Sequence, residues 1–236
     1  MKLAALLIEG RYDKLTGLIT KRIMSYIKKT AKETSADKRS YRGYKIWWDE
    51  RPTASRDTGY RVGLFNDPVS GLEVGVQVQL ARIENYGKYM TDGYALRDEE
   101  DLQIVVFLDP AQEPKIYSSL LPEIKNTVRH ELEHMTQKGG QVKKGKKRKF
   151  MWGARASYQI DPSKTWKYYM LADEVDANLQ GLYKQAKTEK KPFQYIVDRW
   201  LSELMETGRV SLSQAKQIYR KMKKRAKEIG GLPPLG

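Results

Sequence analysis

Residues 130–134 read His130-Glu131-Leu132-Glu133-His134, and this stretch decides how the rest of the 236-residue chain is interpreted. Positions four apart on an α-helix lie on one face, one turn from each other. Two imidazoles placed in this way can bind one metal ion, and a glutamate directly after the first histidine lies beside the open coordination position, where it can act as a base. The chain has 2 histidines, and both belong to this motif. The motif therefore predicts a zinc site that contains His130, His134 and Glu131.

The residues around the motif predict a helix over about 118–138 that packs on a sheet. Its apolar positions recur at spacings of three and four, and they are Leu121, Ile124, Val128, Leu132 and Met135. At about 100° per residue, the two histidines project together on the side away from this stripe. Upstream, the sequence predicts strands at 44–48, 60–65, 72–83 and 102–108, with a turn at 66–71 that makes two of them an antiparallel hairpin. The pattern favours an α+β fold with a small, mostly antiparallel sheet packed on the motif helix.

Further helices are expected on both sides of this part. In 12–34, Leu15, Ile19, Ile23 and Ile27 recur at every fourth position, which is typical of a helix with one buried face. Helices are also predicted at 167–187, from about 192 to 204 and at 213–229. The sequence thus predicts four parts: a basic helical segment at 1–40, a strand-rich part ending in the motif helix at 41–138, a basic connecting loop at 139–166, and a helical part at 167–236.

The composition limits how the metal site can be completed. There is no cysteine, so neither a disulfide nor a thiolate ligand is possible, and the third protein ligand must be a carboxylate or another oxygen or nitrogen group. The first residues contain no cleavage site for secretion, and no apolar run approaches the length of a membrane span. We therefore expect a soluble, cytoplasmic protein.

The segment 167–187 offers three carboxylates as the third ligand, Asp173, Glu174 and Asp176. On a helical wheel, Asp173 falls opposite the apolar stripe, while the other two lie on its flanks. Glu174 shares its flank with the small Ala177 and with Asn178, which could hold a ligand imidazole by a hydrogen bond. Glu174 is therefore the favoured ligand, with Asp176 and then Asp173 as alternatives.

HELEH followed by Glu174-Val175-Asp176-Ala177-Asn178 resembles the gluzincins, zinc metallopeptidases in which a later helix supplies a glutamate ligand. The resemblance implies a zincin-like fold, Zn²⁺ held by His130, His134 and Glu174, and Glu131 as general base for the hydrolysis of a protein or peptide substrate. The chain departs from many gluzincins at Asn178, where they carry Asp. It also lacks the further histidine that often binds the oxyanion, for which Tyr158, Tyr168 and Tyr169 are the candidates. A small, Lys-rich zincin without cysteine also resembles proteins encoded by tailed bacteriophages.

The charge distribution suggests partners beyond a peptide substrate. The net charge is +15, and residues 121–236 carry 25 Lys and Arg against 12 Asp and Glu, which gives +13. Such a surface can contact nucleic acid or acidic proteins without sequence specificity, although Lys-rich surfaces are also common on well-solvated proteins. Two alternatives to a peptidase therefore stay open. One is a non-catalytic zincin-fold assembly protein, for example in a phage virion, and the other is a basic nucleic-acid-associated protein.

Overall fold

The computed structural model describes residues 12–30, 37–41, 44–48, 60–68, 71–83, 89–96, 101–109, 115–136, 158, 162–229 and 232–236. These residues fall into two compact units. The first, called the sheet unit, contains the described residues up to Met135, and the second, called the helical unit, contains those from Thr136 onward. Most of the predicted basic connecting loop, 139–166, lies outside the described residues.

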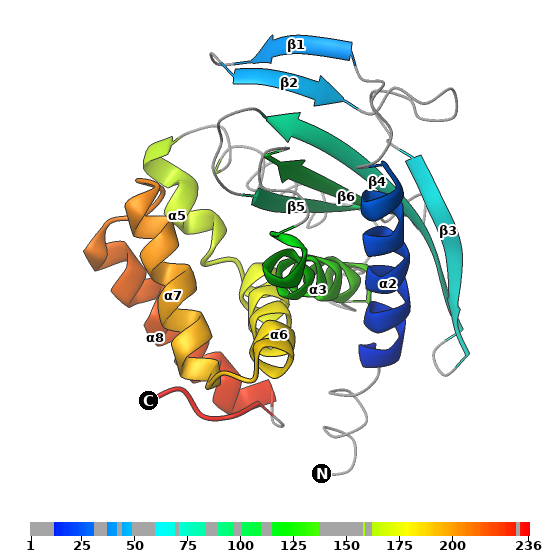
Figure 1. Cartoon of the computed structure of the whole chain (residues 1–236). Coiled ribbons are helices and arrows are strands. Elements are labelled where there is room, and N and C mark those ends of the chain that lie inside the picture. Colours follow the sequence, from blue (N-terminus) through cyan, green and yellow to red (C-terminus); the bar gives the residue numbers. More distant parts are fainter. Residues whose placement is uncertain are drawn as a thin grey trace, which may run out of the picture. The chain divides into compact units, whose positions relative to one another are not determined.

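The sheet unit consists of two helices and a mixed sheet (Figure 1). In chain order its elements are α2 (Asp13–Thr30), β1 (Asp37–Tyr41), β2 (Tyr44–Trp48), β3 (Tyr60–Asp67), β4 (Leu72–Ile83), β5 (Tyr89–Leu96), β6 (Asp101–Leu108) and α3 (Tyr117–Thr136). The described strands form a six-stranded sheet in the order β1-β2-β4-β6-β5, and β3 also pairs with β4. The β4–β6 pair is parallel, and the other pairs are antiparallel. The unit is therefore α+β with a mostly antiparallel sheet, as predicted.

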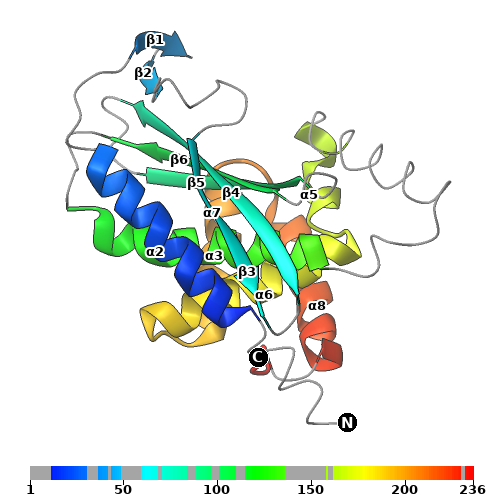
Figure 2. The same ribbon diagram turned by 90° about the vertical axis from the view of Figure 1, so that its right-hand side faces the viewer.

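One apolar core joins the sheet to both helices. Figures 1 and 2 show α2 and α3 on the same side of the sheet. The apolar residues predicted at every fourth position of α2 form its buried face. They are Leu15, Ile19, Ile23 and Ile27. On α3 the buried apolar residues are Leu120, Ile124, Val128 and Leu132. Burial of these large aliphatic side chains is the main favourable contribution to the stability of such a layer. It also fixes the rotation of α3, and so the direction in which the motif side chains point.

The order of the strands corrects one expectation about the site. If the chain binds an extended substrate by backbone pairing, the sequence favours the apolar segment 103–108 as the exposed strand edge, but β6 pairs with β4 on one side and with β5 on the other. Its backbone groups are therefore used within the sheet. Among the described strands, β5 ends the order on this side. The sequence did not predict β5, because Asp92 and Gly93 are residue types that are rare in strands.

The helical unit has its own apolar core. Its elements are the short 3₁₀ helix η3 (Pro162–Lys164), α5 (Thr165–Tyr168), α6 (Ala172–Glu189), α7 (Phe193–Glu206) and α8 (Leu212–Ile229). The helix predicted at 167–187 is interrupted at Leu171, whose backbone is extended, so α6 begins at Ala172. This shift places Glu174 in the first turn of α6. In the described part of the chain, no helix is both long and apolar enough to cross a membrane.

Candidate metal centre

The two histidines of the motif meet on one face of α3. Their Nε2 atoms lie 3.0 Å apart, and the ring planes make an angle of 81°. Two nitrogens bound to one tetrahedral zinc ion at about 2.0–2.1 Å would lie about 3.3 Å from each other. The two rings thus already present their Nε2 atoms at close to the separation that one zinc ion requires. The same pair can also share a proton in an N–H···N hydrogen bond.

Glu131 lies beside the histidine pair and close to β5. Its Oε1 is 3.8 Å from Nε2 of His130, and the residue is 6% exposed. A Cβ atom added at Gly93 of β5 would lie 2.7 Å from Cγ of Glu131 and 2.7 Å from Cγ2 of Thr127. Real Cβ atoms do not come this close to a neighbour, so only glycine allows the present approach of β5 to Glu131.

Two further contacts hold α3 in place around the motif. The hydroxyl oxygens of Thr91 on β5 and Thr127 on α3 lie 2.8 Å apart in a hydrogen bond. On the polar side, Arg129 donates to Glu133 at 2.8 Å and lies over the ring of Tyr12 on the chain before α2, with its guanidinium carbon 5.5 Å from the ring centre. Arg129 is 1% exposed, so this ion pair is largely removed from water. Glu133 is therefore paired with Arg129, whereas Glu131 lies beside His130 of the histidine pair.

In the helical unit, Glu174 is 0% exposed. It is the third residue of α6, where the partial positive charge of a helix N-terminus favours a carboxylate. Glutamate is almost never fully buried in proteins unless an ion pair or a metal compensates its charge. Ala177, on the same flank, is also buried, which agrees with the closely packed surroundings expected for this side of the helix.

The alternative ligands have other surroundings in the helical unit. Asp176 accepts two hydrogen bonds from Arg225 of α8, at 2.6 and 2.8 Å. The hydrogen bond to Asp176 raises the pKa of the Arg225 guanidinium above its ordinary value. Asp176 therefore has a structural role in joining α6 to α8, and Asp173 is only half-buried. Both observations favour Glu174 over these two residues.

Asn178 and the three candidate tyrosines, Tyr158, Tyr168 and Tyr169, all belong to the helical unit. The side-chain amide of Asn178 donates to the backbone carbonyl of Glu174 at 2.8 Å, which supports the first turn of α6. Tyr169 is buried, and its ring packs edge-on against those of Tyr168 and Trp200. These contacts make Tyr169 a core residue. Tyr158 and Tyr168 are both half-buried.

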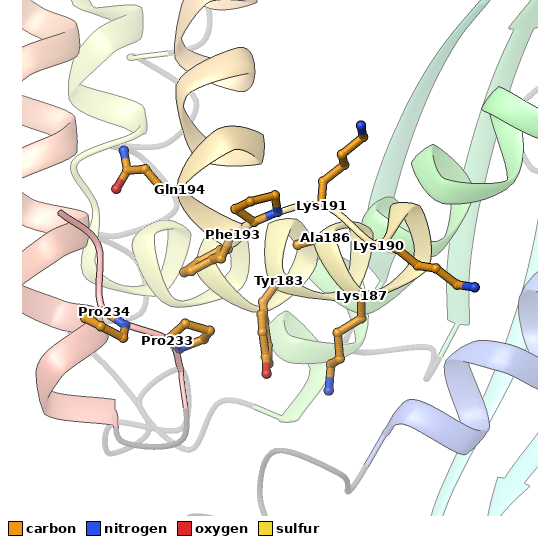
Figure 3. A pocket seen from close by; sticks show the side chains of 10 residues that line it. Tyr183, Ala186, Lys187, Lys190, Lys191, Phe193, Gln194, Pro233 and Pro234 are labelled. Atoms are coloured by element: carbon orange, nitrogen blue, oxygen red, sulfur yellow. The ribbon is translucent and has the colours of Figure 1, made fainter.

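The helical unit also contains a surface pocket of about 460 Å³ (Figure 3). Its walls are mostly apolar, with Tyr183 and Phe193 facing Pro233 and Pro234. Lysines at its rim project away from the two prolines in Figure 3, so they do not converge on a common ligand. None of the residues named for the metal centre lines this pocket. In the sheet unit the candidate metal centre consists of the histidine pair and Glu131, and in the helical unit Glu174 is a fully buried carboxylate.

Comparison of the chain with models of protein families, with curated proteins and with solved structures gives no match.

Proposed function

We propose that this chain is a zinc-dependent metallopeptidase of the gluzincin type. His130, His134 and Glu174 hold the zinc ion, and Glu131 is the general base. The observation that carries the proposal is the pair of imidazole Nε2 atoms 3.0 Å apart, with a carboxylate oxygen of Glu131 at 3.8 Å from one of them. Two neutral imidazoles and a carboxylate form the set of donors that catalytic zinc sites use.

When bound, zinc would lower the pKa of a water molecule that it binds and would polarise the carbonyl of the scissile peptide bond. The protein contributes the proton transfers. Glu131 accepts a proton from the attacking water at its carboxylate, and then donates it to the amine that leaves. The side chain of Glu131, on α3, lies against Gly93 of β5. Its carboxylate is therefore held in a limited space, which favours one orientation for both proton transfers.

Glu174 completes the set in this proposal. A ligand role explains why a carboxylate occupies a fully buried position in the first turn of α6. The proposed ligands are then two imidazoles of α3 and one carboxylate of α6. Zinc binding should therefore be lost when either a histidine or Glu174 is removed.

Strand β5 is the proposed site of substrate binding. It ends the strand order beyond β6, so its outer backbone groups are not used by another described strand. It also passes next to Glu131 at Gly93. An extended peptide that pairs with an edge strand gains main-chain hydrogen bonds along its length. Such pairing would bring a peptide bond of the substrate next to the general base. The class of substrate is thus an extended segment of protein or peptide.

The replacement Glu131→Gln tests the proposal. The variant keeps the shape of the side chain and all proposed zinc ligands but removes the base. We expect about one zinc per chain in the variant, and cleavage of labelled casein or of a quenched peptide library reduced by at least about 100-fold. Zinc is measured by elemental analysis of the purified full-length chain, and cleavage by fluorescence.

Glu123→Gln is the matched control, because Glu123 lies on α3 about two turns before Glu131 and is half-buried. This variant should keep both zinc and activity. Full activity of Glu131→Gln would exclude Glu131 as the base. Absence of cleavage in the zinc-loaded wild type with every substrate of the library would favour the non-catalytic assembly protein instead.

A further inference from the structure

Helix α8 has an unusual excess of positive charge. Of its 18 residues, LSQAKQIYRKMKKRAKEI, seven are Lys or Arg and one is acidic. Its buried residues are Ala215, Ile218, Met222 and Ala226, so the apolar face belongs to the core of the helical unit. A basic amphipathic helix that binds a membrane needs its apolar face free to enter the lipid. That face of α8 is covered by the protein, so a lipid surface is disfavoured as the partner.

Three of the seven cations bind other parts of the helical unit. Arg225 forms the double hydrogen bond to Asp176 of α6. The Nζ atom of Lys221 donates to the backbone carbonyl of Met170, and that of Lys223 to the carbonyl of Gly236 at 2.6 Å. These three residues stabilise the helical unit, because their hydrogen bonds join α8 to Asp176, Met170 and Gly236.

The other four, Lys216, Arg220, Lys224 and Lys227, are exposed. At about 100° per residue they lie within a sector of about 80° on the helix, and at about 1.5 Å per residue they span about 16 Å along its axis. Lys216 with Arg220, and Arg220 with Lys224, are like-charged pairs four residues apart, which destabilise a helix. The stripe therefore carries a cost in folding stability that a partner of opposite charge would remove.

The backbone of duplex DNA has the complementary charge. One strand of the duplex places a phosphate at about every 3.4 Å along the axis, so about five phosphates of one strand match the length of the stripe. Proteins that bind single strands usually offer aromatic rings for base stacking. The hydroxyl oxygen of the aromatic residue of α8, Tyr219, instead lies 3.0 Å from Oε1 of Gln194 and 2.5 Å from the carbonyl oxygen of Gly236, so its one proton is used within the helical unit. The chemistry thus suits phosphates of a duplex better than unpaired bases.

We propose that Lys216, Arg220, Lys224 and Lys227 form a binding surface for the phosphate backbone of duplex nucleic acid, without sequence specificity. The surface is independent of the metal centre. It would keep a peptidase close to proteins that are themselves bound to DNA.

The test measures binding of the full-length chain to a short labelled DNA duplex of random sequence by fluorescence anisotropy, at several salt concentrations. Four phosphate contacts predict a slope of about −3.6 for log affinity against log salt, or about a 150-fold loss between about 50 and 200 mM. The variant with all four residues changed to Gln should bind more than about 10-fold more weakly at the lowest salt, with a slope close to zero.

A control variant removes the same number of charges elsewhere. Lys14→Gln, Lys21→Gln, Lys29→Gln and Lys115→Gln change exposed residues of the sheet unit. This variant should keep the slope of the wild type. A further variant, Lys216→Arg with Lys224→Arg and Lys227→Arg, should bind as the wild type does, and circular dichroism confirms that α8 is folded in each case.

Three results would overturn the proposal. The first is equal weakening in the two Gln variants, because net charge alone would then account for binding. The second is tighter binding of a single strand than of the duplex. The third is a wild type that shows no binding to the duplex at the lowest salt.

Discussion

The absence of a side chain at Gly93 is as important for the proposed chemistry as the presence of one at Glu131. The β5 backbone passes so close to α3 that a methyl group at position 93 would collide with Glu131 and Thr127. The hydrogen bond between Thr91 and Thr127 holds the same two elements together two residues away. Glu131, the proposed general base, is thus positioned by its own helix and by the neighbouring strand.

Gly93→Ala should therefore move Glu131 or displace β5. We expect a loss of about 1–3 kcal/mol in the free energy of unfolding, as for other overpacked positions, together with a fall in kcat. Urea denaturation and peptide hydrolysis of the same preparation measure the two effects.

Gly17→Ala is the control for this replacement. Gly17 is a glycine of α2 with nothing within 4 Å of an added Cβ, so alanine should stabilise the helix by up to about 1 kcal/mol and leave kcat unchanged. Unaltered activity and stability in Gly93→Ala would show that the close approach does not constrain Glu131.

At the scale of elements, α6 and α7 are joined by an ion pair. Arg199 of α7 donates to both carboxylate oxygens of Glu189 at the end of α6, at 2.8 and 2.7 Å. The hydrogen bond from Arg199 lowers the pKa of Glu189 below its ordinary value of 4.5, with a further contribution from Gln185. Because the pKa is lowered in the folded state, the pair stabilises the fold above pH 4.5, and this stabilisation is lost as the pH falls through the lowered value.

Glu189→Gln should reduce the free energy of unfolding by about 1 kcal/mol at neutral pH. The difference from the wild type should vanish in acid, because the wild-type carboxyl is then also neutral. Thermal unfolding at several pH values measures this. Glu206 lies at an exposed position at the end of α7. For the control variant Glu206→Gln, the difference in stability from the wild type should not depend on pH in this way. A constant difference between Glu189→Gln and the wild type well below pH 4.5 would rule out the ion pair as its source.

The elements with regular apolar patterns could be predicted from the sequence. Strand β4 covers 72–83 as expected, and the buried face of α2 contains the apolar residues that recur at every fourth position. Strand β5 could not be predicted, because its Asp-Gly sequence serves a contact with α3 that lies far away in the chain. The start of α6 at Ala172 could not be predicted either, because it depends on tertiary packing and not on local helix propensity.

In the candidate site, too, some features follow from the local sequence pattern and others depend on contacts between distant residues. The spacing of the histidines is a property of one helix, so HELEH was sufficient to predict that the imidazoles meet. The preference for Glu174 over Asp176 rested on small and polar neighbours. The structure adds an independent reason, the ion pair between Asp176 and Arg225, whose residues are 49 positions apart in the sequence. No local pattern could have shown that pair.

In the whole molecule, the described residues form two units, and each unit has its own apolar core. The proposed ligands His134 and Glu174 are 40 residues apart in the sequence. A short segment that contains the HELEH motif alone therefore lacks one of the proposed ligands.

The zinc content of the purified chain is the decisive measurement for the proposed metal centre. We expect about one zinc per chain in the wild type and in Asp173→Ala, and none in His130→Ala or Glu174→Ala, as measured by elemental analysis after dialysis. Asp173 precedes Glu174 on α6 and is the matched control. A wild type that contains no zinc, or a Glu174→Ala variant that retains it, would contradict the account.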